Sequence, residues 1–484
     1  MTPRQAILTG TLLGVLFSQI MILIVLALFP YLPDPGFSNL NMNVYFLLAP
    51  LSTIFLLALL YAWLLRFVAR VAIRYSPSAR SAAHFLSEPF QKILASVRTR
   101  SLSESTQTFK ILSRPRLLLV ISLAASILLA FVPYRPDVNP NGVLVGVDSP
   151  TYVTWIIQML ARPAAQALQY AFVGGLDGSR PLLLVVLYTA ASLGFSLGVS
   201  PSQIIEYLPM ILAPLLTLST YAFVRFGQGN ASFAALTALF TPFTFYLPVG
   251  LWGGYYANMA ALVLSYLFLT LLLLFSKSPS PTKYAAMFAL SAALFLTHPW
   301  TWVLTATTAL VFALSIWRET HLTIHLKSIA GILIAGVVLD VLKSTLFTTR
   351  SVAADLATKL PTNADASSFW INLVDGLLYT HSGLLASWII LGVGLFACFA
   401  LRFKDRFERL VILWVATASI PFLILDSYNQ TRIVYDLPIP VLMAAAILFY
   451  LPLVGNRKLR WPGIIILIIL VTCANYALQG ILLL

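Results

Sequence analysis

The stretch PLLLVVLYTAASLGFSLGVS, residues 181–200, decides how the chain is arranged in a membrane. It contains no charged residue and is about as long as a helix that crosses a bilayer, which needs roughly 20 apolar residues. If this stretch crosses, every later loop changes sides. Whether it crosses therefore has to agree with the distribution of basic residues along the whole chain.

The composition predicts an all-α polytopic membrane protein. Hydrophobic residues make up 60% of the 484 residues and charged residues 10%, which is too apolar for a soluble protein of this size. The apolar runs are long and continuous rather than short and alternating, which disfavours a membrane β-barrel. We predict thirteen transmembrane helices, near residues 7–29, 43–73, 116–133, 203–225, 230–248, 253–275, 283–297, 301–317, 326–347, 384–402, 408–425, 434–454 and 462–482.

Basic residues predict which side of the membrane each loop occupies. Segment 66–116 carries ten of them against two acids, Glu88 and Glu104, so we expect it in the cytoplasm. The later basic groups share that side only if 181–200 does not cross. We therefore predict that 151–200 is one external segment with interfacial helices, in a multi-pass protein of the cell membrane whose N-terminus is cytoplasmic and whose C-terminus is external. Those later groups are Arg225, Lys277 with Lys283, Arg318 to Lys327, Arg402 to Arg409, and Arg457, Lys458 and Arg460.

Three regions follow from this arrangement. Residues 1–75 are predicted to form a two-helix transmembrane hairpin, with the first helix retained rather than removed as a signal peptide. Residues 76–115 form a basic cytoplasmic linker, either with an amphipathic helix on the inner leaflet or as a solvated connector. Residues 116–484 form the transmembrane core.

The charge balance and the cysteines exclude several other classes. The net charge is +14, but the basic residues lie between hydrophobic runs, so we predict no nucleic-acid binding. Cys398 and Cys473 lie inside apolar runs and suit packing rather than a disulfide or a metal site. The partners that fit are membrane lipids.

Polar residues gather in the predicted external loops, whereas the cytoplasmic loops hold mostly lysine and arginine. Such residues are costly at the membrane edge, so their placement carries information. We predict a polar pocket where several of these loops meet. They include NGVLVGVDSPTYVTW at 141–155, GLWGGYYANM at 250–259, THPWTW at 297–302, a longer loop at about 348–383 and LDSYNQTRIVYDLP at 425–438.

Asp148 is the candidate catalytic residue of this pocket. A carboxylate at the membrane edge can accept a proton from an attacking hydroxyl group, although a solvated turn or a helix N-cap also explains a lone aspartate. Arg432 and Arg180 are candidates for binding a phosphate, since guanidinium matches it in bidentate geometry. Asp137 and Asp177 are further acids of the same loop.

Aromatic and imidazole side chains are candidates for lining the pocket against a sugar or a lipid chain. Interfacial aromatic residues often form only the membrane belt, and a histidine at a helix end is often only hydrogen-bonded, so these alternatives stay open. The candidates are Tyr152, Trp252, Tyr255, Tyr256, His298 and Trp300.

With these residues in place, the chain resembles the GT-C superfamily of membrane glycosyltransferases. GVDSPTYVTW follows the apolar run 116–133 as the family's essential acid follows its first core helix, with Asp148 as the match. The layout is similar to that of the oligosaccharyltransferase catalytic subunit, through IIEYLPMILAPLLTLSTYAFVRF at 204–226 and PVGLWGGYYANMAALVLSYLFL at 248–269. The resemblance covers about residues 116–450 and implies a polyprenyl-phosphate-linked sugar donor at the non-cytoplasmic face.

The chain departs from that family at several points. Tyr256 and Ala257 stand near the positions of a second acidic motif, which argues against the divalent metal, Mg²⁺ or Mn²⁺, that the resemblance implies. The acceptor signature and a large C-terminal soluble domain are absent from the printed sequence, so the acceptor class (protein, lipid or glycan) stays open. Two alternatives also remain: a catalytically silent GT-C-like scaffold, and a lipid or solute transporter using Asp340 and Lys343.

Overall fold

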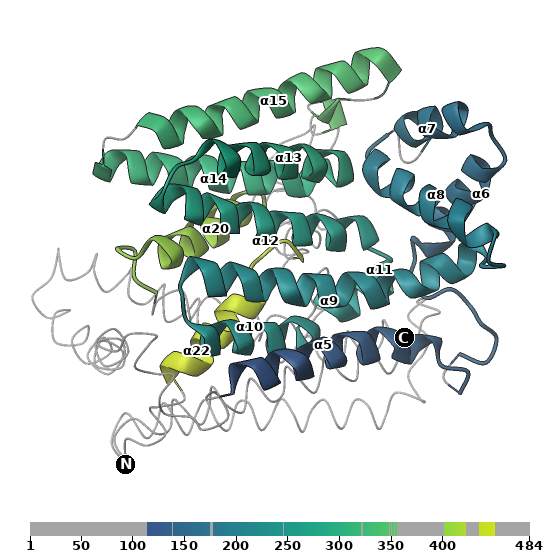
Figure 1. Cartoon of the computed structure of the whole chain (residues 1–484), viewed down its shortest axis with the longest axis horizontal. Coiled ribbons are helices and arrows are strands. Elements are labelled where there is room, and N and C mark those ends of the chain that lie inside the picture. The colour runs from purple at the N-terminus through teal and green to yellow at the C-terminus, as the bar shows by residue number, and fades with distance from the viewer. Residues whose placement is uncertain are drawn as a thin grey trace, which may run out of the picture.

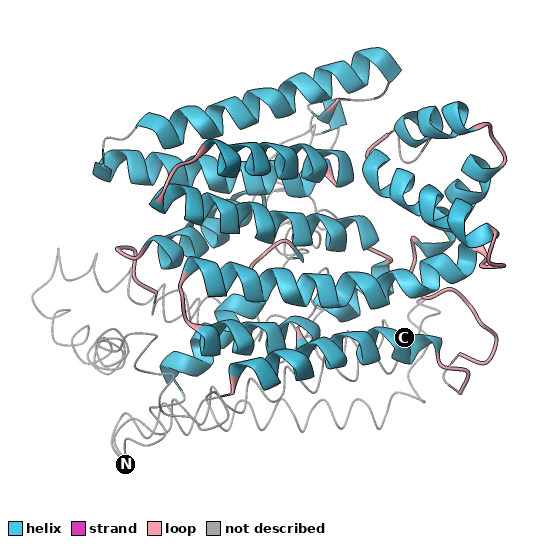
Figure 2. Ribbon diagram, viewed as in Figure 1, coloured by secondary structure: helices cyan, strands magenta, loops and turns pink. Residues whose placement is uncertain are grey.

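A computed structural model describes the central part of the chain, drawn in colour in Figure 1. All regular elements in these residues are helices (Figure 2). The described residues are 114–137, 139–174, 178–244, 246–320, 323–347, 349, 351–352, 354–355, 401–422 and 435–450. The predicted hairpin 1–75 and most of the linker 76–115 lie outside them.

The helices follow the predicted apolar runs closely. α9, for example, is predicted at 203–225 and runs from Pro201 to Gly227. The elements are α5 (Pro115–Phe131), η4 (Val132–Tyr134), α6 (Ser149–Leu160), α7 (Ala164–Val173), α8 (Pro181–Phe195), α9 (Pro201–Gly227), α10 (Ala231–Phe243), α11 (Tyr246–Gly253), α12 (Tyr256–Lys277), α13 (Pro281–Thr297), α14 (Pro299–Thr320), α15 (Thr323–Phe347), α20 (Arg406–Phe422) and α22 (Ile439–Tyr450).

Six helical segments of the described chain are long and apolar enough to cross a membrane. The prediction of an all-α chain is confirmed for the described residues, and a membrane location agrees with these segments. Of the thirteen predicted spans, four fall wholly or mostly in 1–113, 356–400 and 451–484, outside the described residues. The predicted spans 283–297, 408–425 and 434–454 correspond to helices of 17, 17 and 12 described residues, which are not among the six. The six are Pro115–Tyr134, Pro201–Gly227, Ala231–Gly253, Tyr256–Lys277, Pro299–Arg318 and Thr323–Phe347.

Local sequence explains where several of these helices begin. Ser200 starts α9 with a capping box, in which its hydroxyl accepts a hydrogen bond from the Gln203 amide and the Gln203 side chain accepts one from the Ser200 amide. Asn230 caps α10 and Ser280 caps α13 by the same use of a side-chain oxygen. Proline at the first helical position of α9 and α13 costs nothing there, because that amide has no helical partner.

The predicted span 230–248 is interrupted in the structure. Thr244 has an extended backbone with ψ of −176°, so α10 ends there and α11 starts as a separate short helix. Pro248 fits near the start of α11, where its missing amide hydrogen is tolerated. The pair α10–α11 is the most buried of the six segments, with 88% of its apolar window inside the protein.

The helices form a layered array, with α5 at one edge and α15 at the other (Figure 1). α9 packs against α5, α10 and α12, and α14 packs against α13, α15 and α20. Hydroxyl pairs join neighbouring helices inside the array: Ser126 lies 2.6 Å from Thr217 and Thr308 lies 2.6 Å from Thr417. Such bonds suit a membrane interior, where no water competes for the hydroxyl groups.

α6, α7 and α8 form a group of their own at one end of the array (Figure 1). α8 packs against α6, α7 and α13, and its 15 residues span only about 22 Å at 1.5 Å per residue. That length is below the ~30 Å of a bilayer core. The assignment of this end to the external side of a membrane stays a prediction.

Candidate functional site

The loop that carries Asp148 is joined to the turn between α11 and α12 through the backbone. The amide of Val147 donates to the carbonyl of Trp252 at 3.0 Å, and the amide of Asp148 donates to Gly253 at 3.1 Å. Gly146 and Gly254 make this approach possible, with φ of +100° and +64°. We call segments 145–149 and 250–256 together the Asp148 junction.

Side chains close the junction from within. The Ser149 hydroxyl donates to the Val145 carbonyl at 2.5 Å and lies 2.9 Å from the phenol oxygen of Tyr256. Ser149 and Tyr256 are fully buried. In the described structure Tyr256 therefore holds the first loop against α12, and its predicted role in lining a pocket stays a prediction.

Asp148 itself is only partly covered. It occupies the N-cap position of α6, but its side chain makes no capping hydrogen bond. Instead, one carboxylate oxygen lies 3.7 Å from Nη1 of Arg180, and the side chain is 29% exposed. Asp148 thus stands at the N-cap position without capping α6 through its side chain, and its catalytic role stays a prediction.

Arg180 stands directly before α8 and is buried, with 3% of its side chain exposed. Its Nη1 donates to the phenol oxygen of Tyr152 at 2.5 Å. Its Nε is buried and has no hydrogen-bond partner among the described atoms. A buried guanidinium with an unused donor is costly, because the donor has lost its water without a replacement.

Tyr152 lies one helical turn after Asp148 on α6, so both side chains are on the same face of the helix. It is completely buried, and its ring lies 5.7 Å from the ring of Tyr256. Burial raises the pKa of the Tyr152 phenol above its ordinary value, although the charge of Arg180 opposes this. Asp148, Arg180 and Tyr152 thus form one cluster, which the sequence had supplied as three separate candidates.

The other predicted charged residues are not part of this cluster. Asp137 pairs with Arg135, and this pair is exposed, at 61% and 45% of the side chains. Accepting hydrogen bonds from Arg135 lowers the pKa of the Asp137 carboxyl below its ordinary value. Asp177 and Arg432 lie outside the described residues.

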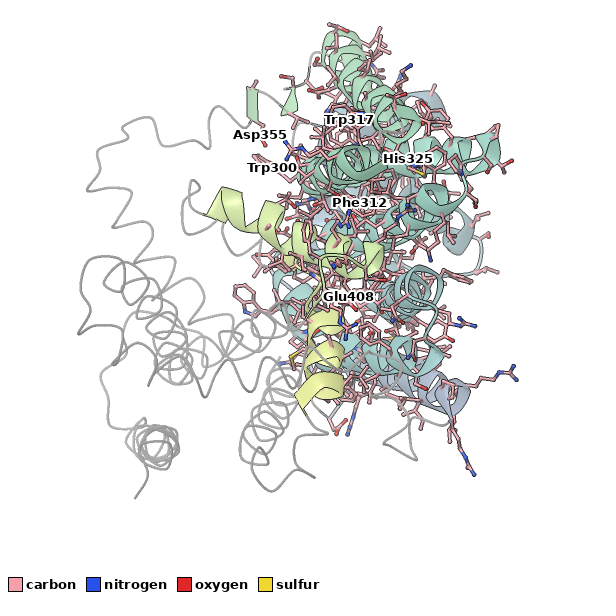
Figure 3. The ribbon with its side chains drawn as sticks, turned by 90° about the vertical axis from the view of Figure 1, so that its left-hand side faces the viewer. Trp300, Phe312, Trp317, His325, Asp355 and Glu408 are labelled. Atoms are coloured by element: carbon pink, nitrogen blue, oxygen red, sulfur yellow. The ribbon has the colours of Figure 1, made fainter. Side chains whose placement is uncertain are left out.

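The remaining aromatic candidates lie at several places around the same end of the array. Tyr255 is buried and its ring meets that of Tyr435 at 5.9 Å, whereas Trp252 is partly exposed. Trp300 is partly exposed and donates from Nε1 to the carboxylate of Asp355 at 2.9 Å. Figure 3 shows Trp300 and Asp355 together at one edge of the described helices.

His298 belongs to a buried polar chain that the sequence did not reveal. It precedes α14, and its Nδ1 lies 2.9 Å from the hydroxyl of Thr301. That hydroxyl donates to the carboxylate of Asp436, 3.1 Å away, and all three residues are at most 3% exposed. YDLP at 435–438 stood in a predicted external loop, but no local signal links Asp436 to a threonine 135 residues away.

Asp340 and Lys343, the residues named for a transporter, bind groups near the C-terminal end of α15. Asp340 accepts from the amide of Val352 at 2.9 Å, and Lys343 donates to the carbonyl of Gly178 at 3.3 Å. Both contacts attach α15 to neighbouring loops. Neither gives a specific reason to place a transport site there.

The binding of a divalent metal beside Asp148 stays a prediction, on which the charge of this cluster bears. The charged neighbour of Asp148 is a guanidinium, which would repel a cation. The cluster is better suited to an anion.

No model of a known protein family matches the chain, and a comparison with curated proteins finds no match.

Proposed function

We propose that this chain is a GT-C-like glycosyltransferase, which moves a sugar from a polyprenyl-phosphate-linked donor to an acceptor at the non-cytoplasmic face. The observation that carries the proposal is the placement of Asp148. Its side chain is 29% exposed, two backbone hydrogen bonds hold its loop against the turn before α12, and it lies 3.7 Å from a buried arginine. A reactive group held on a rigid backbone is what positional catalysis requires.

Asp148 is proposed to act as the base. Glycosyl transfer to a hydroxyl requires a group that takes the hydroxyl proton, and a partly exposed carboxylate can reach an incoming acceptor. The junction fixes Asp148 because Gly146 and Gly254 allow two backbones to meet. The surrounding aromatic residues, Trp252 above all, would then pack against the sugar.

The cationic groups are proposed to stabilise the leaving phosphate. The charged phosphate of a polyprenyl monophosphate lies at the membrane surface, and a guanidinium can bind two of its oxygens. Arg180 lies beside Asp148, and Arg432 is the second candidate from the sequence. These two residues make a metal-independent mechanism the simpler choice, although Mg²⁺ or Mn²⁺ can be tested directly by addition of a chelator.

The lipid part of the donor needs an apolar path, and α9 supplies a surface of the right kind. Tyr207, Ile211, Leu215 and Leu218 repeat every three or four residues along this helix and are each at least 41% exposed. One face of α9 is therefore apolar and uncovered by the described residues, as expected for a surface in contact with lipid. We propose that the polyprenyl chain approaches from this side.

The test is a reconstituted transfer assay. Purified protein in liposomes is given a radiolabelled polyprenyl-phosphate sugar together with protein, lipid or glycan acceptors, and a parallel sample measures lipid scrambling. Transfer by the wild type that is lost in Asp148→Asn supports the proposal. Scrambling without transfer supports a transporter instead, and donor binding with neither activity supports a silent scaffold.

A further inference from the structure

The pairing of Asp148 with Arg180 has two unusual features when taken together. The two charged atoms are 3.7 Å apart, whereas a charge-assisted hydrogen bond between such groups is about 2.7–2.9 Å long. Among the described atoms, the buried Nε of Arg180 also has no hydrogen-bond partner. Asp148 therefore leaves part of the hydrogen-bonding capacity of the Arg180 guanidinium unused.

The geometry points to Arg180 as the residue that binds a phosphate oxyanion, with Asp148 occupying its place until the phosphate arrives. This deepens the proposed function, on which it rests for the identity of the donor. A phosphate has several acceptor oxygens and can satisfy both Nε and a terminal nitrogen of a guanidinium. A single carboxylate oxygen at 3.7 Å does not.

We call the replacement of the Asp148 carboxylate by the phosphate the exchange. Tyr152 holds the Arg180 guanidinium in place during it. Its phenol oxygen accepts from Nη1 of Arg180 at 2.5 Å, and Tyr152 is itself locked by complete burial. The guanidinium therefore stays in place when its anionic partner changes. Asp148 is the part that can move, since its side chain is 29% exposed and makes no capping hydrogen bond.

The exchange links donor binding to the chemistry of Asp148. In the ion pair, one carboxylate oxygen of Asp148 is directed at Nη1 of Arg180 and not at an incoming acceptor. When a phosphate takes the place of the carboxylate beside Arg180, the Asp148 side chain is released toward the exposed side. Asp148 would then be free to accept a proton from the acceptor hydroxyl only after the donor has bound.

The exchange predicts that Asp148 competes with the phosphate for Arg180. The apparent affinity of a site for a ligand equals its intrinsic affinity multiplied by the fraction of time that the site is free of the internal group. Asp148→Asn should therefore bind phosphate more tightly than the wild type, by roughly three- to tenfold. A purely structural ion pair, or a base with no contact to the donor phosphate, predicts no gain in affinity.

Binding is measured with the full chain in nanodiscs, using two probes: a polyprenyl monophosphate in the bilayer, and inorganic phosphate in the buffer. Arg180→Gln should weaken binding by about 10- to 100-fold, because it removes a charge-assisted contact. Asp137→Asn is the matched comparison, since this aspartate pairs with an arginine in the same loop but is exposed. It should bind as the wild type does.

Tighter binding of the lipid phosphate by Asp148→Asn supports the inference, and tighter binding of both probes identifies the phosphate group alone as the ligand. Equal or weaker binding of both probes overturns it. A second measurement needs no variant: carbodiimide labelling of wild-type Asp148, relative to Asp137 in the same sample, should rise severalfold when the lipid phosphate is added, and an unchanged ratio contradicts the exchange. Binding without sugar transfer would reject the proposed function and leave this inference intact.

Discussion

Gly146 and Gly254 meet so closely that a Cβ atom on Gly146 would lie 2.9 Å from the Cα atom of Gly254. The same Cβ atom would lie 2.5 Å from the carbonyl oxygen of Leu251. The Asp148 junction thus depends on the absence of a side chain at two positions that lie 108 residues apart in the sequence.

Gly146→Ala should lower the free energy of unfolding by about 2 kcal/mol or more, because it combines a steric clash with a left-handed backbone. Gly142→Ala is the control: it has φ of +60° but nothing within 4 Å of the added carbon, so only about 1 kcal/mol is expected. Denaturant titration of both variants in detergent micelles measures the difference. Equal losses would mean that the backbone contact with Gly254 contributes nothing.

The hydrogen bond between Ser149 and Tyr256 can be tested by a double-mutant cycle. Ser149→Ala and Tyr256→Phe each remove one side of a buried contact of 2.9 Å. We expect a coupling free energy of about 0.5–1.5 kcal/mol, the usual net value of a hydrogen bond inside a protein. Unfolding measurements on the two single variants and the double variant provide it, and strictly additive losses would show that the two hydroxyls act independently.

Two adjacent threonines on α14 allow a hydrogen bond between helices to be compared with a hydrogen bond within one helix. Thr308 contacts Thr417 of α20, whereas Thr307 is exposed and donates to the Val303 carbonyl of its own helix, its one partner among the described residues. Thr308→Val should cost about 0.6 kcal/mol, the average for such bonds in membrane proteins. Thr307→Val should cost less, and a loss at Thr307 as large as that at Thr308 would argue against the interhelical bond.

The buried chain of His298, Thr301 and Asp436 predicts a sharp difference between two substitutions. Thr301→Val removes a hydroxyl donor from a carboxylate that is 3% exposed, and should cost about 1–3 kcal/mol. Thr301→Ser keeps the hydroxyl and should retain most of the stability. Thermal unfolding of both variants is the measurement, and similar losses would mean that the hydroxyl bond to Asp436 contributes no more stability than packing of the threonine methyl group.

Much of the fold could be predicted from hydrophobicity and charge because each helix is a local feature. α9, α14 and α15 begin and end within three residues of the predicted spans. The break after α10 was missed because the prediction followed hydrophobicity and gave no weight to the prolines in TPFTFYLP, residues 241–248. Pro248 has no amide hydrogen to donate to the Thr244 carbonyl four residues earlier, so a continuous helix is disfavoured at this point.

The candidate site was predicted as residue types and not as an arrangement. Asp148, Arg180 and Tyr152 could be named because polar groups are rare in such a chain, and the structure brings these three together. The contact of Ser149 with Tyr256 and that of Thr301 with Asp436 join residues more than 100 positions apart. Their pairing depends on how the helices pack, so a single sequence could not supply it.

The most direct test of the account is the single-turnover release of polyprenyl phosphate from a bound sugar donor in the presence of acceptor. We expect wild type and Asp137→Asn to release it at the same rate, and Asp148→Asn to be slower by about 10²–10⁴-fold, the usual contribution of a general base. Equal release by the wild type and by a correctly folded Asp148→Asn variant would contradict the assignment of Asp148.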